Sequence, residues 1–191
     1  AAKLLEENIK EDDLVHYANS MSVRLGEIYA RHYINCNRGL NGIEGSLSTF
    51  AGAALAQMQE ELRSPRAYCV IGDLSFFYDH NALWLNQLEG NARILLLNNG
   101  QGGIFKSLRG LEASQAAEMF VAGKHGLSAK GICETFGVKY LKARNTEELE
   151  TGIRKLASAE SERPVLLEVF TDPDKDIEVY SQYYRQLKLE L

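Results

Sequence analysis

The sequence predicts an α/β fold of three layers, in which helices cover both faces of a mostly parallel sheet. Short apolar runs alternate along the chain with longer segments whose apolar residues recur at helical spacing. Strands that alternate with helices of about ten residues form βαβ crossovers, and such crossovers make the strands parallel. No stretch rich in Pro, Gly or Ser has the character of an interdomain linker, so we expect one domain over residues 1–191.

The first half of the chain begins with two short strand-and-helix pairs. Residues 14–18 have the apolar character of a short strand, and residues 21–31 place Val23, Leu25 and Ile28 on one side of a helix. Residues 33–36 are expected to form another short strand, which a glycine-rich turn over residues 37–45 follows. Residues 46–61 have helical spacing, and their small residues at 51–54 permit close packing on a sheet.

The second half repeats the alternation with stronger signals. The Asn145-Thr146 pair is a start signal for one of the helices. The last segment of the chain is amphipathic and closes it as a helix. We expect strands over residues 67–71, 94–97, 138–143 and 165–170, and helices over residues 77–88, 128–136, 147–157 and 178–191.

Composition excludes several classes of protein. Hydrophobic residues make up 45% and charged residues 25%, which is the balance of a soluble globular protein. The net charge of −5 and the lack of any Lys/Arg block disfavour non-specific nucleic-acid binding. Three widely spaced cysteines without a CxxC pair disfavour a zinc site or disulfides and fit the cytoplasm. No apolar run could span a bilayer, and a start at Ala1 leads us to expect a piece of a longer protein.

The residues that follow two of the expected strands favour a phosphate and metal site. Gly72-Asp73-Leu74-Ser75 follows one strand, and Asn98-Asn99-Gly100-Gln101 follows the next. Ligands of parallel sheets bind at the carboxyl ends of strands, where glycine lets a phosphate approach and side-chain oxygens suit Mg²⁺. Taken singly, Asp73 could cap a helix and the Asn-Asn-Gly run could be a turn. One helix and one strand separate the two motifs, and this combination favours the site.

Four motifs in order carry a resemblance to a known family. Gly72-Asp73 followed by Asn98-Asn99 resembles the fingerprint of thiamin diphosphate-dependent enzymes. Within them the chain is most similar to the 2-succinyl-5-enolpyruvyl-6-hydroxy-3-cyclohexene-1-carboxylate synthase family of menaquinone biosynthesis, in its C-terminal diphosphate-binding domain. The motifs behind this resemblance are Asn19-Ser20 with Arg24, the segment from Asn37 to Thr49, the Gly72–Ser75 segment and the segment from Asn98 to Phe105.

The resemblance implies a role for each matching residue, in a thiamin diphosphate-binding fold. Mg²⁺ or Mn²⁺ would be bound by the side chains of Asp73 and Asn99 and by a main-chain oxygen. The glycine-rich segment leaves that last ligand open by one residue, with Gln101 as the choice. Ile43 would be the apolar wedge under the bent cofactor. Substrate carboxylates would be held by Ser20, Arg24 and Arg38, and the cofactor by Ile43, Gly72, Asp73, Leu74, Ser75, Asn99, Ile104, Phe105 and Leu108.

The resemblance also implies the reaction and the partners. The family decarboxylates 2-oxoglutarate on thiamin diphosphate and adds the product to isochorismate, and its activating glutamate lies on an N-terminal domain. We therefore expect no catalytic residue in this chain, an inactive isolated fragment, an N-terminal domain as partner, and a homodimer or homotetramer. An acetolactate synthase or 2-oxoacid decarboxylase type and a non-catalytic α/β interaction module stay open as alternatives. The four histidines, His16, His32, His80 and His125, match no motif and are interpreted as structural or surface residues.

Overall fold

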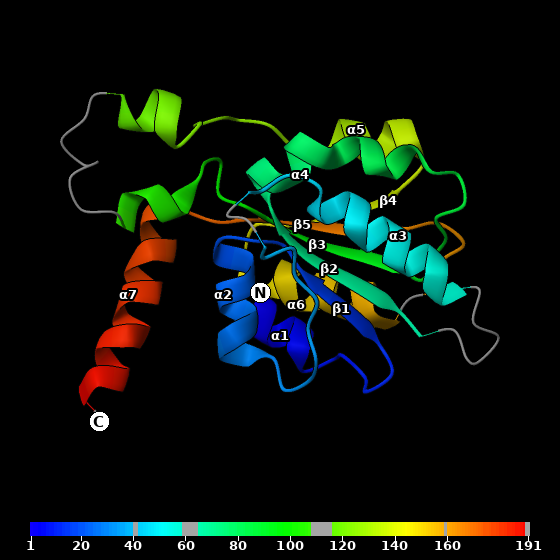
Figure 1. Cartoon of the computed structure of the whole chain (residues 1–191), viewed down its shortest axis with the longest axis horizontal. Helices are drawn as coiled ribbons and strands as arrows, with labels where there is room; N and C mark the ends of the chain where they lie inside the picture. Colours follow the sequence, from blue (N-terminus) through cyan, green and yellow to red (C-terminus); the bar gives the residue numbers. More distant parts are fainter. Residues whose placement is uncertain (40–41, 59–64, 108–115, 159, 190–191) are drawn as a thin grey trace.

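A computed structural model describes residues 1–39, 42–58, 65–107, 116–158 and 160–189. Within these ranges five strands form one sheet in the order β1-β2-β3-β5-β4, and every neighbouring pair is parallel (Figure 1). The α/β class with a parallel sheet is therefore confirmed. The strands are β1 (Leu14–Tyr17), β2 (Ala67–Gly72), β3 (Ala92–Asn98), β4 (Lys139–Ala143) and β5 (Val165–Phe170).

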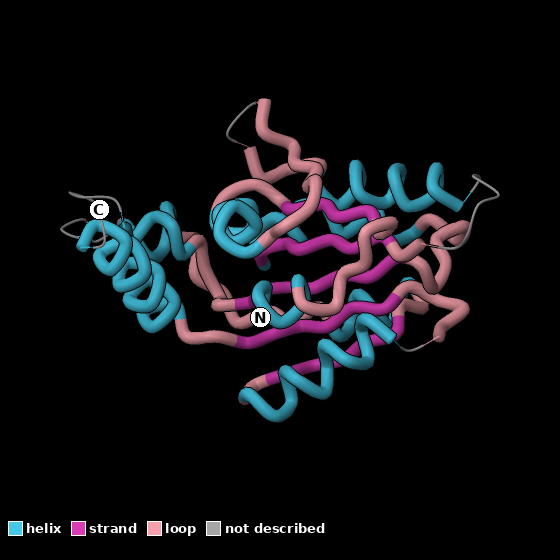
Figure 2. Tube along the Cα trace, turned by 90° about the horizontal axis from the view of Figure 1, so that it is seen from below, coloured by secondary structure: helices cyan, strands magenta, loops and turns pink. Residues whose placement is uncertain are grey.

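Helices cover both faces of the sheet, as three layers require (Figures 1 and 2). One face carries α3 (Ser46–Met58), α4 (Asp73–Asp79) and α5 (Lys130–Phe136), and the 3₁₀ helix η1 (His80–Trp84) lies with them. The other face carries α1 (Ala2–Glu6), α2 (Met21–Tyr29) and α6 (Thr146–Ser158).

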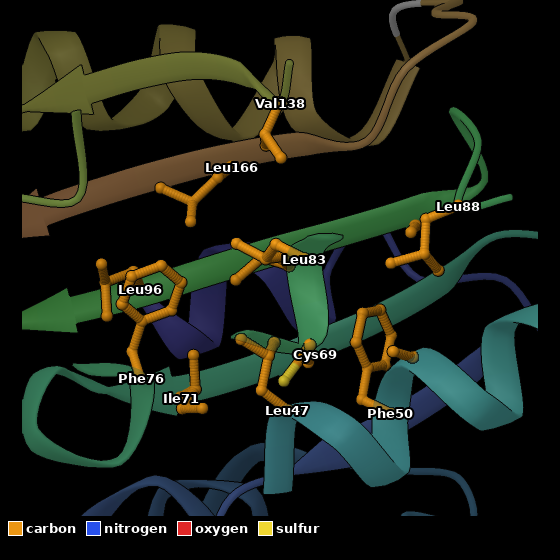
Figure 3. Packing of buried hydrophobic residues seen from close by; sticks show 14 of the residues in the cluster. Leu47, Phe50, Cys69, Ile71, Phe76, Leu83, Leu88, Leu96, Val138 and Leu166 are labelled. Carbon is orange, nitrogen blue, oxygen red and sulfur yellow. The ribbon is translucent and has the colours of Figure 1, made fainter. Parts of the chain in front are cut away.

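Two apolar cores lie on opposite sides of the central strands. Leu47, Phe50 and Phe76 pack against Ile71 on the first face (Figure 3). Neighbouring Val70 faces the second core, with residues such as Leu5, Val23 and Leu156. Because both faces of β2 and β3 are buried, these strands read as continuous apolar runs rather than as an alternation.

The C-terminal helix α7 (Pro173–Leu189) stands apart from the sheet in both views (Figures 1 and 2). Its neighbour is the short 3₁₀ helix η2 (Gly103–Ser107), which follows β3, and a π-helical turn, η3 (Ala117–Val121), lies between η2 and α5 in the chain. The first turn of α7 therefore lies beside the segment that leaves β3.

Two expected elements were wrong. Residues 33–36 do not form a strand, since Asn35 alone makes an isolated bridge with His16. The helix expected over residues 77–88 begins earlier, with α4 at Asp73, changes to 3₁₀ geometry at His80 and ends at Trp84, where Leu85 takes an extended backbone. Helix α1 was not predicted from the sequence.

The last helix was predicted with its start too late. It begins at Pro173 rather than at residue 178, because proline suits the first helical position. Asp172 Oδ1 accepts the N–H groups of Asp174 and Lys175, which stabilises this start. The expected ends at residues 61 and 191 lie outside the described residues. None of the described helices combines the length and the apolar character that a membrane-spanning segment needs.

Candidate functional site

The loops that follow β1, β2, β3 and β5 meet at one edge of the sheet. Since all strands are parallel, Ser20, Asp73, Asn99 and Thr171 each lie just beyond a carboxyl end at that same edge. The structure thereby brings together motifs that are far apart in the sequence. This is the edge at which α/β folds bind their ligands.

Asp73 connects the end of β2 to the loop after β3. Its side chain is buried, at 6% exposure. Oδ1 accepts the N–H of Leu74 at 2.8 Å, and Oδ2 accepts the N–H groups of Gly100 at 2.7 Å and Gln101 at 3.2 Å. Because two of these donors lie in the loop after β3, Asp73 is more than a local helix cap.

The pKa of Asp73 is raised, chiefly because burial disfavours the charged carboxylate. The N–H of Leu74, the charge of His125 and the N–H groups of Gly100 and Gln101 act in the opposite direction. A cation beside the carboxylate would add to these stabilising contacts. Burial therefore makes the Asp73 carboxylate costly to ionise, and a neighbouring positive charge lowers that cost.

The loop after β3 turns at Gly100, whose φ of +77° is a conformation that favours glycine. Its N–H is shared between Asp73 Oδ2 and Asn98 Oδ1, the latter at 3.0 Å. The N–H of Gln101 is shared in the same way between Asp73 Oδ2 and Asn99 Oδ1, at 3.2 and 3.3 Å. The side-chain oxygens of Asp73 and Asn99 therefore converge on one main-chain nitrogen.

Gln101 is a suitable source of a third oxygen ligand. The carbonyl groups on either side of it are engaged, since Gly100 accepts the N–H of His125 at 2.8 Å and Gly102 accepts that of Phe105 at 3.2 Å. The Gln101 side chain is 3% exposed, and its Nε2 has no hydrogen-bond partner among the described residues. Among the described residues, no group of three or more His, Cys, Asp or Glu is placed to hold a metal ion. A cation here would thus rely on amide and main-chain oxygens beside Asp73, which is chemistry that suits Mg²⁺.

The segment that contains Ile43 is held from two sides. Asn19 Nδ2 donates to the carbonyl oxygen of Gly42 at 2.8 Å, and the Ser75 hydroxyl donates to the carbonyl oxygen of Ile43. Ile43 is half-buried, whereas Ser75 is 4% exposed. The Ser75 hydroxyl therefore positions the expected wedge in this structure, and its contact with a diphosphate stays a prediction.

The expected substrate residues lie at the end of β1. Ser20 has φ 72° and ψ −131°, and no other described non-glycine residue has a positive φ. Arg38 is exposed, and its Nη1 donates to Asn19 Oδ1 at 3.3 Å. Arg24 lies one turn along α2 from Ser20 and is half-buried, with a buried Nε that lacks a partner among the described residues. Backbone strain at Ser20 is typical of a functional position.

Residues expected to line the cofactor pocket divide into described and undescribed ones. Ile104 and Phe105 lie in η2 and are half-buried, as is Leu74 in α4. Gly72 ends β2 with extended backbone, at φ −79° and ψ 160°. Leu108 lies outside the described residues. The pocket roles of all these residues stay predictions.

Three residues of this edge were missed by sequence reasoning. His125 Nε2 lies 3.3 Å from Asp73 Oδ2, an ion-pair distance without hydrogen-bond geometry, and its ring and that of Phe77 form a T-shaped pair. Asp176 accepts the Asn99 amide, and buried Glu168 accepts the Asn98 amide. No motif contains these residues, because they follow a loop or lie within β5 and α7. Only the tertiary structure reveals them.

Residues 18–169 match the family described as "Thiamine pyrophosphate enzyme, C-terminal TPP binding domain". The chain belongs to this family. Thiamine pyrophosphate is the same molecule as thiamin diphosphate, so the fingerprint and the family agree. The matched range begins just before Asn19 and includes every described site residue discussed above except Thr171 and Asp176.

Curated relatives of this thiamine pyrophosphate family domain are named 2-succinyl-5-enolpyruvyl-6-hydroxy-3-cyclohexene-1-carboxylate synthase. The protein of Phocaeicola vulgatus is 44% identical over 184 residues, which cover 94% of this chain and 32% of the relative. That of Bacteroides fragilis is 44% identical over 178 residues, 91% of this chain and 31% of the relative. That of Christiangramia forsetii is 37% identical over 98% of this chain and 32% of the relative. The chain thus spans about a third of the length of these relatives.

A solved structure supports the fold. Benzoylformate decarboxylase from Polynucleobacter necessarius superimposes with a TM-score of 0.70 over 90% of this chain and 32% of that chain. Sequence identity is 20%, so the likeness concerns the fold alone. It is consistent with the three-layer α/β arrangement described above.

Proposed function

We propose that the chain is the diphosphate-binding domain of a longer 2-succinyl-5-enolpyruvyl-6-hydroxy-3-cyclohexene-1-carboxylate synthase. The single structural observation behind the proposal is the convergence of Asp73 and Asn99 oxygens at the N–H of Gln101. The names of relatives at 37–44% identity support the choice of synthase. In this proposal the protein decarboxylates 2-oxoglutarate and joins the product to isochorismate.

The residues at the carboxyl edge would divide the work of binding. Asp73, Asn99 and the Gln101 carbonyl would hold Mg²⁺ or Mn²⁺, and the metal would offset the negative charge of the diphosphate. Ile43, Ile104 and Phe105 would exclude water from the reacting centre. When bound, thiamin diphosphate would supply the electron sink for decarboxylation. An N-terminal domain, from a partner copy in a homodimer or homotetramer, would complete the site.

The residues near β1 favour a dicarboxylate-binding enzyme over other thiamin enzymes. Arg24 lies one turn along α2 from strained Ser20, and Arg38 donates to neighbouring Asn19. Both substrates carry two carboxylates. A guanidinium pairs with a carboxylate through two parallel hydrogen bonds, so two arginines suit two such groups. Benzoylformate and pyruvate each carry only one carboxylate, so an enzyme for either substrate would not need two arginines to bind it.

The test uses the complete natural protein that contains residues 1–191. We expect consumption of 2-oxoglutarate only when thiamin diphosphate and Mg²⁺ are both present, and product formation with isochorismate as acceptor. Arg38→Ala should reduce kcat/KM for the dicarboxylates by about 10- to 150-fold, because a charge-assisted contact is lost, while cofactor affinity stays unchanged. Exposed Arg31 provides the matched control, Arg31→Ala. Turnover of pyruvate or benzoylformate in place of 2-oxoglutarate would refute the choice of synthase.

A further inference from the structure

The amide of Asn99 is held at both ends. Its Nδ2 donates to Asp176 Oδ2 at 3.2 Å, and its Oδ1 accepts the N–H of Gln101 at 3.3 Å. Asp176 lies in the first turn of α7 and is half-buried. The same Oδ2 accepts the Thr171 hydroxyl at 2.7 Å, which keeps the carboxylate in place at the end of β5.

The carboxylate decides which way the amide turns. An ionised carboxylate accepts hydrogen bonds and donates none, so the nitrogen end of Asn99 must face Asp176. The oxygen end then faces the loop where Gln101 also donates to Asp73 Oδ2. If the amide rotated by half a turn, it would point two N–H groups at this place and would repel a cation there.

The preceding residue repeats the arrangement. Asn98 Nδ2 donates to Glu168 Oε1 at 2.8 Å, and Asn98 Oδ1 accepts the N–H of Gly100 at 3.0 Å. Glu168 is fully buried in β5. Both amides at the end of β3 are thus oriented by carboxylates of the β5–α7 segment, so the orientation of Asn99 is part of a consistent pattern.

We propose that Asp176 is a positioning residue of the cation site, which fixes the Asn99 amide so that its oxygen is presented to the metal. This inference rests on the proposed function. Partners that orient a metal ligand typically contribute 10- to 100-fold to metal affinity. The position of Asp176 at the start of α7 also makes metal binding depend on where this helix begins.

Asp176 has a second physical effect that the experiment must separate. An acidic residue in the first turn of a helix stabilises the helix through its dipole. Exposed Asp174 lies in the same turn and carries the same charge. Asp174→Asn is therefore a matched control for the loss of a negative charge at this helix start.

The experiment titrates Mn²⁺ into the complete natural protein with saturating thiamin diphosphate and counts free Mn²⁺ by electron paramagnetic resonance. We expect Asp176→Ala to weaken Mn²⁺ binding about 10- to 100-fold. Asp176→Asn should stay within a few-fold of wild type, because one amide oxygen can accept both Asn99 and Thr171. Asp174→Asn should match wild type. If Asp176→Asn were as weak as Asp176→Ala, charge rather than orientation would matter, and the proposal would be wrong.

In the Asn99→Asp variant, Asp176→Ala should have a different effect on Mn²⁺ affinity. Asn99→Asp has two equivalent oxygens, so it needs no orienting partner, and Asp176→Ala should then leave Mn²⁺ affinity unchanged or raise it by removing a like charge. Weaker binding in this background would contradict the proposal. If Asp176→Ala does not fold, Asp176→Asn is combined with Asn99→Asp instead. We expect this double variant to bind Mn²⁺ more tightly than Asn99→Asp alone. Wild-type protein that binds no Mn²⁺ would overturn the proposed function as well, whereas wild-type binding with an unaffected Asp176→Ala would overturn the role of Asp176 alone.

Discussion

The carboxylate of Asp73 accepts the main-chain N–H of Gly100 at 2.7 Å, a bond that joins the end of β2 to the loop after β3. The bond links the Gly-Asp motif of the thiamin diphosphate fingerprint to the residue that directly follows its Asn-Asn motif. Gly100 can donate in this direction because its positive φ turns the chain back toward the sheet edge. The affinity of the site for a cation should consequently depend on Asp73 more than on any other single side chain.

Asp73→Asn should uncouple metal binding from cofactor binding. An amide at this position has only one acceptor oxygen for the three N–H donors of Leu74, Gly100 and Gln101, and it lacks the charge that Mg²⁺ requires. In wild type we expect Mg²⁺ and thiamin diphosphate each to strengthen binding of the other. In the variant, calorimetric titration of each ligand with and without the other should show this mutual effect lost.

The same variant also tests the structural part of the role. A buried donor left without its acceptor costs about 1–3 kcal/mol, so unfolding of the ligand-free protein in urea should show a loss of that size. A simple helix cap would be replaced by Asn with almost no loss. Unchanged coupling between Mg²⁺ and thiamin diphosphate would exclude Asp73 as a metal ligand.

Ser20→Gly should stabilise the protein. A non-glycine residue at φ 72° and ψ −131° costs about 1–3 kcal/mol, and glycine removes this strain at an entropic cost of about 0.4–1 kcal/mol. We expect a net gain of about 1 kcal/mol in the free energy of unfolding, measured in urea. Ser20→Ala keeps the strain and serves as the control. A glycine variant no more stable than the alanine variant would show that the backbone at Ser20 is relaxed.

Stability should fall as the pH drops below about 6.5, partly because of His16. Burial lowers the pKa of His16 to about 4, and its Nε2 has no partner in the described structure. Above the unfolded-state pKa of about 6.5, His16 is neutral in both states and has no effect. Below that value the unfolded chain takes up the proton first, so about 2 kcal/mol is lost by pH 5.

His16→Gln tests this contribution, since glutamine does not titrate. Urea unfolding of wild type and variant at pH 7.5 and pH 5 gives the difference in free energy directly. We expect the variant to lose about 2 kcal/mol less than wild type between the two pH values. Parallel losses in both proteins would mean that His16 is protonated without penalty in the folded state.

The buried carboxylate of Glu168 should make Tyr140 unusually costly to replace. Glu168 Oε2 accepts the Tyr140 and Ser128 hydroxyls at 2.7 Å each, and Oε1 accepts Asn98 Nδ2 and the N–H of Ala129. Burial and the bond to Glu168 raise the pKa of Tyr140 to about 12. Tyr140→Phe removes one charge-assisted bond and should lower the free energy of unfolding by about 1–2 kcal/mol.

Exposed Tyr78 offers the control, since Tyr78→Phe should change stability by less than about 0.5 kcal/mol. Alkaline titration of tyrosine absorbance, followed as the difference between wild type and Tyr140→Phe, should show the missing phenol near pH 12. A difference between the two titration curves centred near pH 10 would contradict the bond between Tyr140 and Glu168.

The amino-acid sequence by itself determined the fold class and most of the strands. Residues 165–170 were predicted with the bounds of β5, and residues 67–71 with those of β2 less one residue, because both faces of a central parallel strand are apolar and leave an unbroken run. The Gly-Asp and Asn-Asn motifs were also visible, since glycine and oxygen ligands at strand ends are local features. The start of α6 was visible for the same reason, as Asn145 Oδ1 accepts the N–H of Glu148.

Tertiary structure decided how those motifs are held together. Residues 33–36 were expected as a strand from their local propensity, but Asn35 alone finds a partner, because strand formation requires a neighbour along its whole length. Glu168 accepts the amide of Asn98, and Asp176 accepts that of Asn99, across 70 or more positions of sequence. His125 and Asp73 are separated by 52 positions. Such contacts depend on the strand order β3-β5-β4 and on where α7 starts. No periodicity or spacing along the chain encodes that order, so the orientation of the site could be known only after the sheet was assembled.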